Sequence, residues 1–216
     1  MIVHVWSDIV CPWCYVGKRR FERGLERFPQ RDRVEVVYRS FQLNPDAPAG
    51  QTSDRQEMLR RKYRLTQEQV EALDARMVET AKAEGLEYHL KGTRTGNTLD
   101  AHRLLQLALD ERKQHAALER LYRAYFTEQR SIFEHEPLVE LGVEAGLDPS
   151  KTREALAGDG YADRVALDLA QARAIGIGGV PFFVIDEKYG VSGAQSPEVF
   201  ADALARAWSG GKTNGS

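Results

Sequence analysis

The chain has 216 residues, of which 42% are hydrophobic and 29% charged, and its net charge is -2 at pH 7. These values are typical of a globular protein with a sizeable core, and the near-neutral charge gives no reason to expect nucleic acid as a partner. No apolar run approaches the roughly 18 residues of a membrane-spanning helix. The first residues, "MIVHVWSD", lack the basic and long apolar regions of a secretory signal, so we expect a cytoplasmic protein without a membrane partner.

The N-terminal part of the chain is predicted to form a strand, a helix and a second strand. Residues 2–6, "IVHVW", are rich in β-branched and aromatic residues, which favours a strand. Apolar side chains then recur at helical spacing over residues 21–28. Residues 34–43, "VEVVYRSFQL", predict the second strand, and residues 44–53, "NPDAPAGQTS", predict a loop.

The middle of the chain is predicted to be a block of helices. Capping-box patterns begin at Ser53 ("SDRQ") and Thr66 ("TQEQ"), and each marks a helix start. Apolar side chains recur on one helical face over residues 101–109, 118–126 and 165–172. Short loops between these segments complete the pattern of a helical bundle.

The C-terminal part returns to strands. Residues 180–185, "VPFFVI", predict a short buried strand, and "VSGA" at 191–194 predicts its hairpin partner after the turn "DEKYG". Ser196 and Pro197 are residue types that suit a helix N-cap and first turn. The end of the chain, residues 209–216, has no apolar content and is expected to be disordered.

The order of these elements predicts an α/β protein with a helical insertion. Residues 1–48 and 176–210 are expected to form one domain, a four-stranded sheet with flanking helices. Residues 49–175 are expected to form the inserted helical domain.

Cys11 and Cys14, in "DIVCPWCYVG", are the only cysteines of the chain. A disulfide between them closes a very short loop and would stabilise the fold little. Structural zinc needs four ligands, and the five histidines contain no suitably spaced pair to complete a site, so we expect no metal. A redox pair is the remaining interpretation. At a helix N-terminus the helix dipole favours the thiolate of Cys11 as nucleophile, with Cys14 one turn later as the shielded resolving thiol.

Longer motifs add a family resemblance. Together, "DIVCPWCYVGK", "FQLNPD", "GNTLDAHRL" and "GGVPFFVIDEKYGVSGAQSPE" resemble the FrnE-like subgroup of DsbA-related thiol–disulfide oxidoreductases. This subgroup is often grouped with 2-hydroxychromene-2-carboxylate isomerases and kappa-class glutathione transferases. The resemblance spans residues 1 to about 208 and implies a thioredoxin-like fold with a large α-helical insertion. It also implies that Cys11 and Cys14 are the catalytic pair.

The same resemblance points to residues that contact the substrate. Pro181 matches the cis-proline that faces the cysteine pair in thioredoxin folds, although base rates for X–Pro bonds alone favour a trans bond. A cis Pro181 would present the backbone of Val180 to an extended substrate as a short strand addition. Pro12 and Trp13, between the two cysteines, are expected to contact the substrate as well.

Three polar residues are possible accessories, each with a structural alternative. Asn97 and His102 match the subgroup motif, but a role as helix N-cap fully explains Asn97, and His102 is then a half-buried, satisfied histidine. With His102 near the thiols, an imidazolium would favour the thiolate. Asp8 is either a proton acceptor for Cys14 or a polar residue that ends the strand.

Two functions remain open. The first is a cytoplasmic thiol–disulfide oxidoreductase or isomerase that acts on protein or peptide thiols and disulfides. It would use a redox-active disulfide and no tightly bound cofactor, and an unidentified reductant would recycle it. The second is a glutathione-dependent isomerase or transferase acting on a small aromatic or electrophilic substrate, with glutathione as co-substrate. In such relatives a serine is expected near the Cys11 position and no resolving cysteine is needed, so the presence of both cysteines favours the first.

Overall fold

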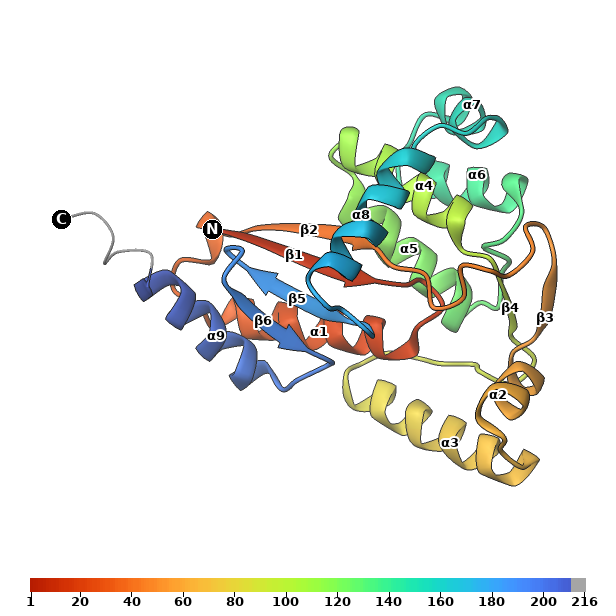
Figure 1. The fold of residues 1–216 in the computed structure, drawn as a ribbon, viewed down its shortest axis with the longest axis horizontal. Coiled ribbons are helices and arrows are strands. Elements are labelled where there is room, and N and C mark those ends of the chain that lie inside the picture. The colour runs from red at the N-terminus through yellow and green to blue at the C-terminus, as the bar shows by residue number, and fades with distance from the viewer. Residues whose placement is uncertain (211–216) are drawn as a thin grey trace. The chain divides into compact units, whose positions relative to one another are not determined.

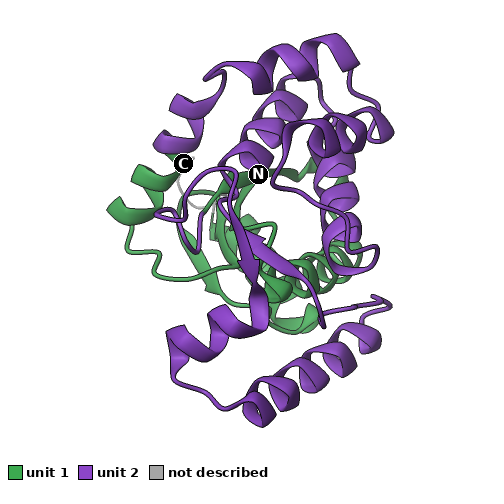
Figure 2. Cartoon of the chain, turned by 90° about the vertical axis from the view of Figure 1, so that its right-hand side faces the viewer, with its two compact units in different colours: residues 1–41, 168–216 green, residues 42–167 purple. Residues whose placement is uncertain are grey.

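The computed structural model describes residues 1–210, which form two compact units drawn in different colours in Figure 2. The outer unit contains residues 1–41 and the chain from Asp168 onward, and the inserted unit contains residues 42–167. Both boundaries lie earlier in the chain than the expected 48 and 175.

The outer unit is built around one four-stranded sheet in the order β2-β1-β5-β6 (Figure 1). β1 and β2 are parallel, because α1 crosses over between them, and β5 and β6 follow antiparallel. This is the sheet that the sequence predicts from the two ends of the chain. Its elements are β1 (Ile2–Ser7), α1 (Pro12–Glu26), a short 3-10 helix (Arg31–Arg33), β2 (Glu35–Ser40), the end of α8 (Ala162–Ala174), β5 (Phe182–Ile185), β6 (Tyr189–Ser192) and α9 (Pro197–Gly210).

Several element boundaries differ from the predictions. β6 covers residues 189–192, so it includes the last two residues of the expected turn and ends before the expected 194, and β1 continues one residue further, to Ser7. β2 ends at Ser40, before the expected residue 43, and β5 begins at Phe182, because Pro181 has no N–H to donate to the sheet. α9 extends to Gly210 and so includes the first two residues of the expected disordered tail. The rest of that tail, residues 211–216, lies outside the described residues.

One face of the sheet is covered by α1 and α9, which approach each other closely. Phe21 of α1, Phe183 of β5 and Phe200 of α9 meet there, with ring centroids 4.6–5.5 Å apart. Gly24 permits this approach, because a Cβ at that position would lie 2.7 Å from the Cβ of Phe200. Aromatic contacts at these distances stabilise the core beyond the area they bury.

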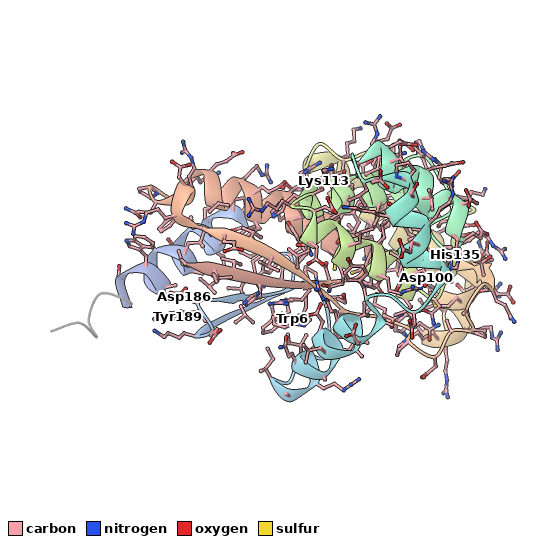
Figure 3. The ribbon with its side chains drawn as sticks, turned by 90° about the horizontal axis from the view of Figure 1, so that it is seen from above. Trp6, Asp100, Lys113, His135, Asp186 and Tyr189 are labelled. Atoms are coloured by element: carbon pink, nitrogen blue, oxygen red, sulfur yellow. The ribbon has the colours of Figure 1, made fainter. Side chains whose placement is uncertain are left out.

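The other face of the sheet carries an apolar cluster of Trp6, Ala172 and Ile177. Beside this cluster, the buried carboxylate of Asp168 holds α8 against the sheet. The Trp6 indole, labelled in Figure 3, donates a hydrogen bond to the backbone oxygen of Asp168 at 3.0 Å. The Asp168 carboxylate accepts from the Ser40 N–H at 2.8 Å and pairs with Arg39. These contacts explain why the unit boundary falls inside α8 and not after it.

The inserted unit is mainly helical, as expected, with one small addition. Residues 52–54 and 94–96, which the sequence does not predict as strands, pair as a two-stranded antiparallel ribbon. The elements are β3 (Thr52–Asp54), α2 (Arg55–Tyr63), α3 (Gln67–Ala83), β4 (Arg94–Gly96), α4 (Leu99–Asp110), α5 (Gln114–Phe126), α6 (His135–Glu144), α7 (Pro149–Ala157) and the start of α8.

Two predicted caps have different outcomes in this unit. The capping box at Thr66 is confirmed: its hydroxyl accepts from the Gln69 N–H, and the Gln69 side chain accepts from the Thr66 N–H. The cap predicted at Ser53 is wrong by one residue, since Asp54 accepts from the Glu57 N–H and begins α2. Ser53 instead pairs with β4.

A buried arginine ties several helices of the inserted unit together. Arg103, on α4, donates to the backbone oxygens of Ala155 and Gly160 around the end of α7. Its ion-pair partner Asp100 also contacts His135 at the start of α6, at 3.0 Å (Figure 3). Within residues 1–210, every helix is too short or too polar to span a lipid bilayer.

His4 of β1 makes the stability of the outer unit depend on pH. Arg39 donates a hydrogen bond from Nε to His4 Nδ1 at 3.2 Å, so the imidazole is a neutral acceptor. Burial, followed by the charge of Arg39, lowers the pKa of His4 below its ordinary 6.5, and the charges of Glu187, Asp168 and Glu35 oppose the shift. The unfolded chain therefore binds more protons than the folded protein between that lowered pKa and about 6.5.

We predict that acidification through this window destabilises the protein. The contribution of His4 is fully present above pH 6.5 and decreases as pH falls towards the lowered pKa of the folded state. A His4→Asn variant keeps an acceptor for Arg39 and cannot titrate, so it should lose less stability than the wild type. Urea unfolding at pH 7.5 and 5.5 measures the difference, and equal losses in both proteins would refute the assignment.

Candidate active site

The turn between β1 and α1 places Cys11 at the start of the helix. β1 ends at Ser7, and the Cys11 N–H donates to the Asp8 backbone oxygen at 3.1 Å, which closes the turn. Cys11 is the N-cap residue of α1, with an extended backbone, and Pro12 occupies the first helical position. The first N–H groups of a helix have no partners within it and form the positive end of its dipole. The predicted position of Cys11 is therefore confirmed.

Cys14 lies one turn further along and differs from Cys11 in its surroundings. Both residues are buried, Cys14 with 2% and Cys11 with 5% of its surface exposed, and the difference lies in the pKa of Cys14. Burial raises the pKa of the Cys14 thiol well above its ordinary value, and a hydrogen bond with the Cys11 side chain and the charge of Cys11 raise it further. A backbone hydrogen bond from Asp8 works in the opposite direction. At neutral pH Cys14 is therefore protonated, which is the state expected of a resolving thiol before a mixed disulfide has formed.

The segment Val180–Pro181 lies against this pair. The peptide bond between the two residues is cis, as the resemblance implied. The Cys11 thiol donates a hydrogen bond from Sγ to the Val180 backbone oxygen at 3.5 Å. The Gly193 N–H donates to the Pro181 oxygen at 2.8 Å, and Val180 packs against the cluster that contains Trp6. Hydrogen bonding and packing together hold the segment beside Cys11.

The two residues between the cysteines present different surfaces. Pro12 is partly buried, whereas the side chain of Trp13 is 47% exposed. An exposed indole next to a reactive thiol offers apolar contact area to a bound molecule. It stays a prediction that the substrate contacts these two residues and the segment beside them, Val180 and Pro181.

Asp8 is 1% exposed, and its charge is among the causes that raise the pKa of Cys14. This places the carboxylate within electrostatic range of the Cys14 thiol. Its role as a proton acceptor remains a prediction, with a structural role at the end of the strand as the alternative.

Asn97 and His102 belong to the inserted unit, and their participation at the thiols stays a prediction. The N-cap residue of α4 is Thr98, one residue later than expected. Asn97 still caps an N–H group of the first turn of α4, because its Oδ1 accepts from the Leu99 N–H at 2.9 Å. It also donates to the Ala47 oxygen at 2.7 Å and thereby organises the preceding loop. His102 lies on α4 and is 1% exposed.

Gly17 and Arg20 of α1 also contact the site, although the sequence patterns do not single them out. A Cβ at Gly17 would lie 2.8 Å from Pro181 Cγ, so only glycine allows the present approach of the Val180–Pro181 segment to α1. Arg20 donates to the Ala194 oxygen at 2.7 Å. A glycine inside a helix is unfavourable by itself, and its position three residues after Cys14 was the available signal. Among the described residues, no group of three or more His, Cys, Asp or Glu side chains gathers to hold a metal ion.

The comparisons agree with this geometry. Residues 2–205 match the family model described as a DSBA-like thioredoxin domain, so the chain belongs to this family. Over 210 residues the chain is 30% identical to YwbO, an uncharacterized protein of Bacillus subtilis (strain 168), and the match covers 95% of this chain and 97% of that protein. The family resemblance drawn from the sequence motifs is thus confirmed.

Solved structures support the fold. A probable DsbA oxidoreductase from Streptomyces coelicolor superposes with a TM-score of 0.94 at 49% identity, over 97% of this chain and 90% of that one. A 2-hydroxychromene-2-carboxylate isomerase gives a TM-score of 0.72 at 16% identity, over the whole of both chains. The cytosolic disulfide reductase DsbM from Pseudomonas aeruginosa, solved with GSH, gives 0.67 at 17%, over 98% and 100%. The last two show the shared thioredoxin-like fold alone.

We predict that the two thiols react in a fixed order with an alkylating reagent. Iodoacetamide at pH 7.5 should modify Cys11 in the folded protein and leave Cys14 unmodified, because burial and the raised pKa keep Cys14 protonated. Peptide mapping by mass spectrometry measures both sites over time. Urea should make Cys14 reactive, and modification of Cys14 as fast as Cys11 without urea would contradict the prediction.

Proposed function

We propose that this protein is a thiol–disulfide oxidoreductase that acts on protein or peptide disulfides, with Cys11 and Cys14 as its redox-active pair. The asymmetry of the pair carries the proposal. Both thiols are buried, but Cys11 stands at a helix N-terminus beside the Val180 backbone, whereas Cys14 lies one turn further along with its pKa raised well above the ordinary value. A nucleophile and a resolving thiol need this difference.

The reaction proceeds through two exchanges. The Cys11 thiolate attacks one sulfur of the substrate disulfide, the substrate S–S bond breaks, and the released thiolate takes up a proton. Cys14 then gives up its proton and attacks the Cys11 sulfur of the mixed disulfide, which releases the second substrate thiol. The substrate gains two electrons, and the protein is left with a Cys11–Cys14 disulfide. In the reverse direction the same steps oxidise a dithiol.

Asp8 is the proposed acceptor of the Cys14 proton. Its carboxylate is buried and lies within electrostatic range of that thiol. While Cys14 is protonated, the nearby negative charge disfavours its thiolate. When the mixed disulfide has formed, transfer of the proton to the carboxylate removes this repulsion as the Cys14 sulfur attacks.

The Val180–Pro181 segment is the proposed substrate-binding element. An extended peptide can pair with the Val180 backbone as a short added strand, which places its disulfide near Cys11. The 3.5 Å contact between Cys11 Sγ and the Val180 oxygen supports this role, because it sets the backbone beside the nucleophile. Trp13 adds an exposed apolar surface, and Pro12 forms the adjoining turn.

We also propose that the protein works in the cytoplasm, where a thiol reductant returns the pair to its dithiol form. Structural disulfides are rare in that compartment, so a site of this kind cycles there as a reductase or isomerase. The cytosolic disulfide reductase DsbM, which has the same fold, provides a precedent for this location.

A second candidate is a glutathione-dependent isomerase or transferase with a small aromatic or electrophilic substrate. The shared fold with the 2-hydroxychromene-2-carboxylate isomerase and with the GSH-bound DsbM favours it. In that reaction the protein would bind and activate the glutathione thiol, and Cys14 would have no task. The raised pKa and burial of Cys14 beside Cys11 favour the redox proposal instead.

We predict that a Cys14→Ser variant separates the two functions. In the redox mechanism the variant attacks a substrate disulfide and stops as a mixed disulfide, because no second thiol is left to resolve it. Intact-protein mass spectrometry would detect the adduct, and turnover of a peptide disulfide would fall to the background rate. A Cys11→Ser variant is the control and should form no adduct. Full glutathione-dependent turnover of a small substrate by the Cys14 variant, with no adduct, would overturn the proposal.

A further inference from the structure

α1 contains two buried glycines whose presence is explained by packing and not by backbone conformation. Glycine inside a helix costs about 1 kcal/mol relative to alanine, so each needs a reason. Gly17 and Gly24 both lie within α1, and neither has a positive φ that would require glycine. A Cβ at either position would lie under 3.0 Å from an atom of another segment. At Gly24 that segment is α9, and at Gly17 it is the Val180–Pro181 segment.

The contact at Gly17 leaves no room for adjustment. A Cβ there would lie 2.8 Å from Pro181 Cγ and 3.4 Å from Ala194 Cβ. Carbon atoms in contact prefer about 3.5–4.0 Å, so Pro181 would have to move away by roughly 0.7 Å. The proline ring is joined to the backbone at both ends and cannot turn aside as a flexible side chain does. A Cβ at Gly17 must therefore be accommodated by a change of ring pucker at Pro181, by a shift of the segment's backbone, or by both.

A polar contact on the same helix acts on the same segment. Arg20, three residues after Gly17, donates to the Ala194 oxygen at 2.7 Å. The neighbouring Gly193 N–H donates to the Pro181 oxygen at 2.8 Å. The turn at 193–194 therefore joins α1 to the Val180–Pro181 segment through a chain of two hydrogen bonds.

We propose that Gly17 and Arg20 are positioning residues that fix the Val180–Pro181 segment against the nucleophile. Cys11 is the N-cap residue of the helix that carries both of them, so the packing at Gly17 sets the distance between Cys11 Sγ and the Val180 oxygen. This inference rests on the proposed function, because it concerns substrates that bind along the Val180 backbone. Neither residue takes part in the exchange chemistry.

The test compares two reactions of Cys11 in a Gly17→Ala variant. Exchange with a peptide disulfide needs the Val180 segment in place, whereas alkylation by iodoacetamide needs only the thiol. The ratio of the two second-order rate constants should fall about tenfold in the variant, since displacements well below 1 Å already slow reactions that depend on alignment. A change in stability alone would not alter this ratio.

Gly24→Ala is the matched control. It puts the same Cβ into the same helix against an equally close contact, 2.7 Å from Phe200 Cβ and from the Pro197 oxygen, but on the α9 side. It should lower the urea midpoint and leave the ratio unchanged. Arg20→Ala removes the polar link without adding bulk, and it should lower the ratio in the same direction as Gly17→Ala. This second variant decides the question if Gly17→Ala does not fold.

The possible outcomes are distinct. If the wild type exchanges disulfides and its ratio matches those of Gly17→Ala and Arg20→Ala, the positioning role is wrong and the proposed function stands. A ratio that falls equally in Gly24→Ala would also overturn the positioning role. A wild type that exchanges no peptide disulfide would overturn the proposed function itself.

Discussion

The contact between Cys11 Sγ and the Val180 oxygen joins residues 169 positions apart in the chain, and the sheet of the outer unit makes it possible. β1 and β5 pair antiparallel with Trp6 opposite Phe182. This register brings the residues that follow β1 and those that precede β5 to the same end of the sheet. Cys11 follows the first strand and Val180 precedes the other, so the register brings both residues to the same end of the sheet. A shift of one residue would also turn every side chain of β5 to the other face.

The same arrangement gives the two thiols different properties. Cys11 is the N-cap residue of α1, at the positive end of the helix dipole, whereas Cys14 lies one turn further along, where burial disfavours its ionisation. No metal or cofactor is required for this difference, since it follows from position in the helix. Burial is the largest cause of the raised pKa of Cys14; the charge of Asp8 is the smallest, and a backbone hydrogen bond from Asp8 acts against it.

Local patterns explain what the sequence could predict. The strand "IVHVW", the cysteine pair and the helix after it are adjacent in the chain, and their chemistry needs no distant contact to be recognised. The four-stranded sheet followed from the order of the elements. The cis bond at Pro181 followed only from the family resemblance, because base rates favour trans.

Features that depend on distant partners were missed. The unit boundary inside α8 depends on the contacts of the Asp168 backbone and carboxylate with Trp6, Arg39 and Ser40, which are separated from it by well over a hundred residues. The ribbon of β3 and β4 has strands of three residues each, too short for a periodic signal. The need for glycine at position 17 likewise appears only when Pro181 is placed against it.

The division of the outer unit between the two ends of the chain has a consequence during synthesis. Cys11 leaves the ribosome early, but the Val180 segment follows 169 residues later, and at 5–20 residues per second that is a delay of roughly 10–30 s. During this time the residues of the inserted unit, which are continuous from 42 to 167, are translated and begin to fold. The nascent chain thus carries Cys11 before the segment that covers it exists. Until translation is nearly complete, the thiol depends on the reducing surroundings of the cell for protection.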